Sequence, residues 1–339
     1  MGGGGGPRDY ATYSTSVARE RAMSVPTISR ARDILASLIG AASLEQFTTT
    51  FDPTTGETVD VNMPSETWMI TPDPAVTRSY SLAWLFDDLY FQGRAFWAIT
   101  RRYATGFPAE FTWLPAADVQ TGDQAGPLWY GPSTQITFNG MQLDPSDVVQ
   151  FISPVQGLLS SGARSIEIAR RLDTAAMRFA SNEIPSGWLQ AKAGGESLTG
   201  EELADLAESW AEARSENAIA ALNEWVEWHE TSIDPSKLQL AEARNHQALE
   251  LARVANVPPY LVGVEVGGYT YQNAQQARAD SVTFGARPFI DCIEQTLSSD
   301  RVLPRGRYVR LQLDRWLDNP LLTPAGAQAP ATTGQEVPA

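Results

Sequence analysis

The sequence predicts an α+β fold in which amphipathic helices are combined with groups of short strands. Apolar residues recur at helical spacing in several stretches, most clearly at Leu240–Ala255. Other stretches, such as Ala95–Thr100, have strand-like composition, and turn signals such as Asn139-Gly140 separate the short strands. Hydrophobic residues fill 43% of the 339 positions, which supports a buried core in two domains or in one large elaborated domain.

The chain begins with a segment that has no sustained periodicity. Residues 1 to about 24 are glycine-rich and then polar, and we expect a flexible arm there. Pro26 then opens a predicted amphipathic helix that ends near Gly40, since proline fits the first turn of a helix. The turn-rich stretch Thr48–Met63 predicts a hairpin or an exposed loop.

A second strong helix is predicted after Asp73-Pro74, with Thr77 as its cap and Gln92-Gly93 as its end. The strand Ala95–Thr100 follows immediately. Further short strands are predicted at Phe111–Pro115, at Leu128–Tyr130, at Gln135–Phe138 and in the segment that ends at Ile152. Asn139-Gly140 is a signal for a type I′ hairpin turn.

The predicted helix from Ala163 to Asn182 is the most basic stretch of an acidic protein. Its apolar residues share one side. Arginines occupy other positions, namely Arg164, Arg170, Arg171 and Arg178.

A small separate unit is predicted next, made of a strand, a helix and further strands. Pro185–Ala191 has the composition of a strand, and Thr199 with Glu202 forms a capping box that opens a helix. The helix directs acidic residues outward, and Ala218–Ile233 suggests strands rich in Trp and Val. The acidic positions are Glu201, Asp205, Glu208 and Glu212.

The amphipathic helix near Leu240 carries Glu242, Arg244 and Arg253 among its polar positions and ends at Val257-Pro258-Pro259. A loop with paired glycines, which we expect to be mobile, follows. It consists of Val264, Glu265, Val266, Gly267, Gly268, Tyr269, Thr270 and Tyr271. A second, longer helix then runs from Gln272 to about Leu297, with a kink at Pro288.

After this helix, Tyr308–Leu313 alternates as a strand that returns to an earlier sheet. From Asn319 onward the content of Pro, Ala, Thr and Gly predicts a disordered tail.

The formal net charge of -15 argues against an ordinary nucleic-acid-binding surface, because phosphate contacts rely on clustered Lys and Arg. It does not exclude a channel through which DNA slides, since tight Lys-phosphate contacts would slow the movement. Acidity that serves solubility alone explains the same composition. No apolar run is long enough to span a bilayer and no signal peptide is recognised, so we expect a soluble protein.

One cysteine, Cys292, excludes an intramolecular disulfide and fits a cytosolic folding environment, and we expect it to be a buried small residue. Only two histidines are present, His229 and His246, without Cys or carboxylate at ligand spacing, so no zinc site is expected. The glycines of Gln156–Ile166 lack the Lys-Ser/Thr ending of a nucleotide loop. We expect no cofactor.

Three features bear on enzymatic activity. Asp87 and Asp88 are consecutive on a helix and point in different directions, so they do not form a dyad that shares a proton. No nucleophile elbow or dinucleotide fingerprint is present. A carboxylate-dependent glycoside hydrolase is the hardest enzyme class to exclude, because acidic residues are abundant and ten Trp residues could line a sugar cleft. Most of these Trp residues occupy inward positions, where core packing is the commoner role.

The order of the parts resembles the portal proteins of tailed bacteriophages, in the short form with a clip inserted between two stem helices. The resemblance rests on a helix before Val257–Gly263, a Gly/Tyr/Thr loop that leads into Asn273-Ala274-Gln275-Gln276, and a helix that contains Arg287-Pro288-Phe289-Ile290. The strand-helix-strand insertion between two helices agrees with it. The usual Asp-Gly pair of one loop is replaced by Gln156-Gly157, and the helical crown is small or missing.

The resemblance implies a portal fold with a mixed α/β wing domain, antiparallel stem helices, a small α/β clip and a long kinked helix. It divides the chain into an N-terminal arm (1–25), wing domain (26–160), stem helix (161–182), clip domain (183–237), second stem helix (238–257), turn and tunnel loop (258–273), long kinked helix (274–299), return to the wing (300–318) and disordered tail (319–339).

It also implies a ring, usually a dodecamer, that acts as a DNA channel at one capsid vertex during genome packaging, retention and ejection. The protein would be made in the host cytoplasm and placed in the virion, and it would not be an enzyme. Its partners would be the terminase large subunit, the major capsid and scaffold proteins, the head-tail adaptor and double-stranded DNA bound without sequence specificity. Within that frame, the loop Val264–Tyr271 projects into the bore, and the acidic clip face is either a docking surface or a solvated one.

Under the same resemblance, the arginines of Ala163–Asn182 pair with acidic groups of a neighbouring subunit or face DNA, and the acidic balance of the chain favours pairing. A head-tail adaptor is the alternative from the class of binding proteins, although adaptors are usually shorter and lack such an insertion.

Overall fold

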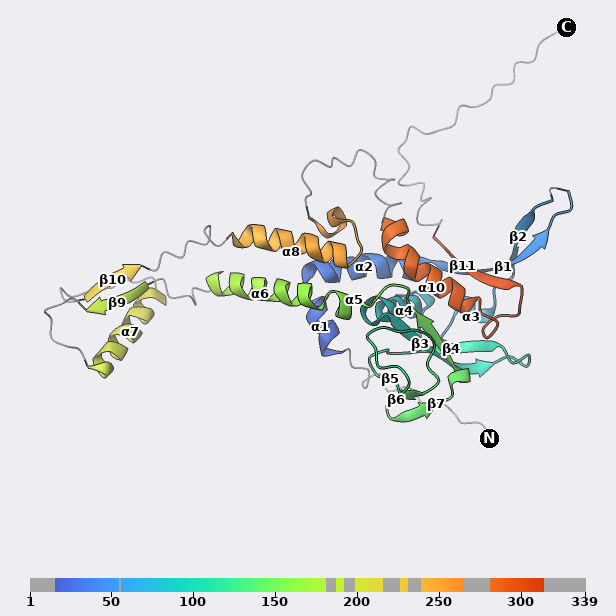
Figure 1. Cartoon of the computed structure of the whole chain (residues 1–339), viewed down its shortest axis with the longest axis horizontal. Coiled ribbons are helices and arrows are strands. Elements are labelled where there is room, and N and C mark those ends of the chain that lie inside the picture. The colour runs from blue at the N-terminus through green and yellow to red at the C-terminus, as the bar shows by residue number, and fades with distance from the viewer. Residues whose placement is uncertain are drawn as a thin grey trace, which may run out of the picture. The chain divides into compact units, whose positions relative to one another are not determined.

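The computed structural model describes residues 16–54, 56–180, 187–191, 199–215, 226–230, 239–264 and 281–313 (Figure 1). The chain forms two compact units. The larger comprises residues 1–167 and 248–339, and the smaller comprises residues 168–247. Among the residues described, no helix is both long and apolar enough to cross a membrane.

Two helices form the centre of the larger unit. α2 (Pro26–Ala41) begins at Pro26 as predicted, and it packs on α4 (Arg78–Gln92) (Figure 1). Thr77 caps α4 by accepting a hydrogen bond from the Tyr80 amide (3.3 Å), and Gly93 ends it with a φ of 75°. Both predicted ends of this helix are therefore confirmed.

The N-terminal region differs from the expected flexible arm. Val17–Met23 forms α1, and the hydroxyl of Ser16 caps it by accepting from the Arg19 amide (3.2 Å). The Arg19 guanidinium reaches across to Asp87 on α4, with Nε 2.7 Å from Oδ2. The expectation of a flexible arm to residue 25 is wrong for α1, because a contact distant in sequence holds it.

The first sheet has the order β4-β3-β8 and is antiparallel throughout. Its central strand β3 (Arg94–Arg102) lies between β4 (Pro108–Leu114) and β8 (Val148–Ile152), which follows the short 3-10 turn Pro145–Asp147. Trp97 on β3 is almost fully buried and contacts the rings of Phe111 and Phe151 from both neighbours. The predicted core role of this Trp is confirmed.

The second sheet contains β5 (Val119–Thr121), β6 (Ile136–Phe138) and β7 (Met141–Leu143). The turn between β6 and β7 has positive φ at Asn139 (48°) and Gly140 (79°), which confirms the type I′ prediction.

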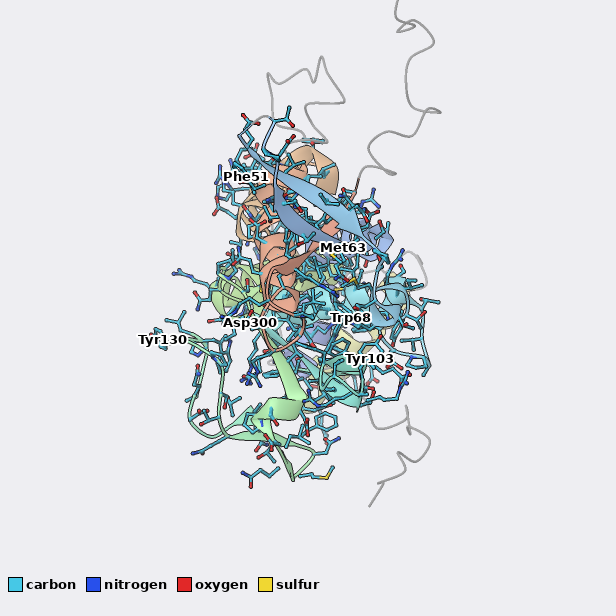
Figure 2. All side chains as sticks on the ribbon, turned by 90° about the vertical axis from the view of Figure 1, so that its right-hand side faces the viewer. Phe51, Met63, Trp68, Tyr103, Tyr130 and Asp300 are labelled. Carbon is cyan, nitrogen blue, oxygen red and sulfur yellow. The ribbon has the colours of Figure 1, made fainter. Side chains whose placement is uncertain are left out.

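The predicted strand Leu128–Tyr130 is wrong, because these residues lie in the loop between β5 and β6. There the Trp129 indole donates to Gln92 O (3.0 Å) and stacks on Arg94, while Tyr130 is exposed at the loop's edge (Figure 2). Packing against distant residues thus takes the place of strand pairing.

The third sheet joins strands from the early and the late parts of the chain. β1 (Ser43–Phe51) lies between β2 (Thr58–Met63) and β11 (Arg307–Gln312), and both pairings are antiparallel. The prediction of a hairpin in Thr48–Met63 is confirmed, as is the return of a C-terminal strand. The short helix α3 (Thr67–Ile70) follows β2 and contacts β1.

The helix expected from Gln272 is described only from residue 281 onward. The described part begins with a π-helical turn, Ser281–Ala286, and continues as α10 (Arg287–Leu297) with Pro288 in its first turn. A π turn followed by proline breaks the regular ladder of hydrogen bonds, as expected for a kink at this position.

The smaller unit contains β9 (Gly187–Ala191) and β10 (Val226–Glu230), which pair antiparallel, and α7 (Gly200–Ser215). The capping box is formed as predicted: the Thr199 amide donates to Glu202 Oε2 (2.8 Å), and the Glu202 amide donates to Thr199 Oγ1 (3.4 Å). The chain enters this unit along α6 (Ala163–Ala180), which follows the short helix α5 (Leu158–Ser161), and leaves it along α8 (Leu240–Val254).

Candidate functional site

The helices α6 and α8 run in opposite directions along the chain's route into and out of the smaller unit (Figure 1). At the start of α6, a Cβ on Gly162 would lie 2.9 Å from Val254 Cγ1 and 2.9 Å from Leu158 O, so the close approach requires glycine. Further along α6, Asp173 Oδ1 lies 2.9 Å from the Arg244 guanidinium on α8. Later residues of α6 therefore contact earlier residues of α8, as in an antiparallel pair.

One face of α6 presents a line of arginines. Arg164, Arg171 and Arg178 are all exposed and lie seven residues apart, so they share a face of the helix, about 10 Å from one to the next. Arg170 is half-buried and lies on a different side. Ile168, an exposed apolar side chain four residues after Arg164, lies beside this line, whereas the exposed Met177 directly precedes Arg178 and lies on another face. The four arginines predicted as one set therefore divide into an exposed arginine line and one side chain elsewhere.

α8 carries its predicted charged residues at both ends. Glu242 is exposed in the first turn, where a negative charge is favourable beside the helix N-terminus. Arg253 lies in the last turn, where a positive charge is favourable, and it pairs with Glu250. The charges of Glu242 and Arg253 thus interact favourably with the ends of α8, whereas Arg244 links α8 to α6.

The predicted stop after α8 is formed at Asn256-Val257-Pro258. Asn256 adopts a φ of 55°, and a short 3-10 turn (Pro259–Val262) ends at Gly263 with a φ of 79°. Gly285 packs closely on this point, since a Cβ there would lie 3.2 Å from Asn256 O and from Leu35 Cδ2. The loop Val264–Tyr271 leaves from this anchored turn. Val264 is its only described residue, and Glu265–Tyr271 lie outside the described residues.

The acidic residues predicted on α7 follow one another at spacings of four, three and four, which places Glu201, Asp205, Glu208 and Glu212 on one face. The structure exposes Glu201, Asp205 and Glu208, and the side chain of Glu212 lies outside the described part. Like charges four residues apart cost about 0.2–0.5 kcal/mol per pair. Glu201 in the first turn is favoured by the helix N-terminus, whereas the repulsion between the acidic residues further along is a small cost that a basic partner would offset.

The buried carboxylates Asp87 and Asp88 have separate environments, as their positions on the helix predicted. Asp87 accepts from Arg19 and from Arg32 Nε (2.6 Å). Asp88 Oδ2 accepts from Trp113 Nε1 (2.8 Å) and from the Ala116 amide (3.0 Å). Burial raises the pKa of Asp88 well above its ordinary value, although these hydrogen bonds favour the ionised form. Each carboxylate is held by structural contacts of the core.

Sequence reasoning did not single out Arg94, which lies in a small hollow between the first two sheets. Its guanidinium stacks on Trp129 at 3.6 Å and donates to Thr121 Oγ1 (2.8 Å) and Val119 O (3.1 Å). Burial lowers the pKa of Arg94 to about 10. These residues are far apart in the sequence and only the fold brings them together, so no local sequence pattern predicts the hollow.

The remaining candidates for chemistry are structural. Cys292 is buried with Sγ 3.1 Å from Ile152 O, and burial raises the pKa of its thiol to about 11, as expected of a small core residue. Within the ranges that the structure describes, no cluster of three His, Cys, Asp or Glu side chains is placed to hold a metal ion.

Comparison with known proteins gives a consistent family. The sequence profile described as "Phage portal protein" matches residues 26–331. A "Probable portal protein" of Streptomyces phage phiC31 is 27% identical over 194 residues, which is 55% of this chain and 41% of that protein. An uncharacterized protein of Rickettsia felis is 34% identical over 119 residues, which is 34% of this chain and 31% of that protein. The matches thus span less than half the length of these relatives.

Solved structures share the fold. The crystal structure of an HK97 family phage portal protein from Corynebacterium diphtheriae has a TM-score of 0.69 and 24% identity, and the alignment covers 88% of this chain and 95% of that one. A chain from the neck of a native GTA particle, computed with C12 symmetry, has a TM-score of 0.62 and 16% identity over 91% of this chain and 87% of its own.

Proposed function

This chain belongs to the phage portal protein family, and from that membership we propose that it assembles into a ring that forms a DNA channel at one vertex of a capsid. Twelve copies is the number we expect. The supporting observation is the match over residues 26–331, which includes both antiparallel helices, α6 and α8, and the small unit between them. The ring would admit the genome during packaging, retain it, and release it to the tail.

This proposal also names partners and a location. The ring would be made in the host cytoplasm, would nucleate capsid assembly with the scaffold and major capsid proteins, and would reside at the portal vertex of the virion. The terminase large subunit would dock on it during packaging and the head-tail adaptor afterwards. Double-stranded DNA would pass without sequence-specific contacts, in keeping with a formal net charge of -15.

We assign the exposed arginine line of α6 to the contact between neighbouring subunits. Twelve copies of Arg164, Arg171 and Arg178 around a bore would bind phosphates tightly, and each such contact would slow the sliding of DNA. Pairing with acidic groups of the next subunit uses the same charges without that cost. Arg171→Gln should therefore weaken the ring and make its assembly less dependent on salt, because one charge pair per interface is lost. Unchanged ring stability with faster packaging would favour the DNA-facing alternative.

The tunnel loop is assigned to residues Val264–Tyr271 on the basis of the sequence and of its anchored start. Gly263 and the 3-10 turn before it fix where the loop begins. Gly267 and Gly268 would permit changes of conformation, and Tyr269 and Tyr271 would contact the duplex. Deletion of Val266–Thr270 should impair packaging or DNA retention while rings still form. Normal packaging by the shortened protein would rule this role out.

The acidic face of α7 is the proposed docking surface for terminase and then for the adaptor. Glu201, Asp205 and Glu208 project from one exposed helical face, which a basic surface on a partner would complement. Replacement of Asp205 and Glu208 by Lys should reduce motor-driven packaging and leave ring formation unchanged. Replacement of both by Gln should have an intermediate effect, since the attraction to a basic partner is lost without a new positive charge that repels it.

The decisive experiment measures the mass and symmetry of the purified protein by light scattering and by negative-stain class averages. Rings with a central hole and about twelve-fold symmetry are expected. A chain that stays monomeric at every concentration, and also in the presence of scaffold and capsid protein, would contradict the proposal.

A further inference from the structure

The sheet β11-β1-β2 has two edges that differ in how their backbone groups are used. β11 forms one edge and β2 the other, with β1 between them. Sheet edges present rows of amide and carbonyl groups that can pair with another strand. Which edge is available therefore depends on what covers it.

The β11 edge is covered by α10 and the residue that follows it. The outward amide of Val309 donates to Ser298 Oγ (2.9 Å), and the outward amide of Leu311 donates to Glu294 Oε1 (2.8 Å). Burial raises the pKa of the Glu294 carboxyl, which accepts the hydrogen bond from the Leu311 amide of β11. These contacts satisfy the donors that an added strand would need.

The outward groups of β2 follow from the pairing with β1. In the hairpin the Asp52 amide donates to Glu57 O (2.9 Å), and pairs two residues apart repeat this arrangement. Val59 and Val61 therefore bond inward to β1, while the amides of Thr58, Asp60 and Asn62 point outward. None of these three outward amides donates a hydrogen bond to another described residue.

β2 also lacks the features that normally prevent edge pairing. Its register with β1 is uninterrupted, and its sequence, TVDVNM, contains no proline and no lysine. Its single charge, Asp60, is paired with Arg310 at 2.7 Å. Phe51, Val59 and Val61 are exposed by 63%, 46% and 45%. Figure 2 shows the hairpin between Phe51 and Met63 at the outer face of the larger unit.

We propose that the open edge of β2 pairs with a strand of the adjacent copy of this chain. The proposal rests on the ring inferred above and names one of its interfaces. Pairing between two β2 strands would be two-fold and would end at a dimer, so in a ring β2 must meet a different segment of the next copy. Such pairing would cover the exposed valines and the outward amides. Each copy would place its β2 edge against one neighbour and would pair with the β2 edge of its other neighbour.

The test compares two substitutions of one residue. Asn62→Pro removes an outward amide and leaves the inward bonds of Val59 and Val61 in place, and proline is tolerated on edge strands. Asn62→Ala keeps the amide and loses the same side-chain bond to Glu45, which is 3.0 Å long. We expect Asn62→Ala to form rings as the parent does. Asn62→Pro should lower the ring population about tenfold or more at equal protein concentration, with an unchanged circular dichroism spectrum.

Residue-resolved hydrogen exchange on parent rings gives a second test that does not depend on how the proline variant folds. The amides of Asp60 and Asn62 should exchange slowly in the ring, as slowly as those of Val59 and Val61, which serve as internal controls. Fast exchange at Asp60 and Asn62 in intact rings, or equal ring populations for both variants, would overturn the β2 interface and leave the ring itself standing. A parent chain that forms no ring would instead overturn the proposed function.

Discussion

Asp173 on α6 and Arg244 on α8 form an ion pair of 2.9 Å between two helices that run in opposite directions. Gly162 and Val254 meet in the same antiparallel register, where the first helix begins and the second ends. A small residue at one point and a charge pair at another thus set how the two helices are aligned.

The ion pair between Asp173 and Arg244 should make a small, salt-dependent contribution to stability. Both side chains are substantially exposed, at 41% and 54%, so solvent screens the attraction. Arg244→Ala is expected to lower the free energy of unfolding by about 0.2–1 kcal/mol, and the loss should shrink in high salt. Urea unfolding at low and high salt measures it. The exchange Asp173→Arg with Arg244→Asp should recover most of the loss, and failure to do so would refute direct pairing.

Gly162→Ala should be destabilising because the added Cβ lacks room. Backbone strain is not the cause, since Gly162 has a φ of -99°, which alanine adopts readily. The added Cβ would lie 2.9 Å from Val254 Cγ1 and Leu158 O. We expect a loss of about 1–3 kcal/mol in urea unfolding, partly restored by Val254→Ala. Gly200→Ala is the matched control. No atom lies within 4 Å of its Cβ, so stability should stay the same or rise by up to about 1 kcal/mol.

Asp87→Asn should loosen the N-terminal helix. Asp87 is 1% exposed and accepts from Arg19 and Arg32, so the neutral amide leaves two largely buried guanidinium groups without their counter-charge. Loss of a partner from a buried pair costs about 3–5 kcal/mol. Limited proteolysis after Arg19 or Arg21 should become faster along with the drop in urea stability. Asp33→Asn removes an exposed partner of Arg32 and should change neither measurement by much. Equal effects of the two substitutions would contradict this account.

Asp88 should make the folded state less stable as the pH rises. Its pKa is higher in the folded chain than in the unfolded one, because burial disfavours the charge. The group therefore binds its proton more tightly when folded. Its stabilising contribution is present below a pH of about 4 and is lost as the pH rises through the folded pKa.

Asp88→Asn isolates this contribution, because the amide oxygen can still accept from Trp113 and Ala116. The difference in unfolding free energy between the parent and this variant should move against the parent from pH 4 to pH 8. Asp88→Ala removes the acceptor and should cost about 1–3 kcal/mol at every pH in that range. A pH-independent difference between the parent and Asp88→Asn would show that the carboxyl keeps an ordinary pKa.

Local rules predicted several elements correctly. Proline at the first position of α2, the Thr77 cap of α4, the Asn139-Gly140 turn and the box of Thr199 with Glu202 each depend on residues within about four positions of one another. The same reasoning placed the acidic face of α7 and the exposed arginines of α6, since helical spacing alone decides which residues share a face.

The errors arose where a distant partner decides the outcome. Residues 17–23 show little periodicity, and α1 is held by a contact from Arg19 to Asp87, 68 residues away in the chain. Trp129 is a residue type that is common in strands, yet it lies in a loop. Its ring packs against the Arg94 guanidinium and its indole donates to Gln92 O, and neither contact is part of a strand pairing.

The sequence by itself determined the long helices α2, α4, α6, α7 and α8, the Asn139-Gly140 turn and the insertion of a small unit between two helices, because these depend on short-range hydrogen bonding and on the period of apolar residues. Only the tertiary structure decided that β11 pairs with β1, that α10 covers one edge of their sheet, and that no other described strand pairs with the edge formed by β2. An edge becomes open or covered through long-range packing, which no window of a few residues contains.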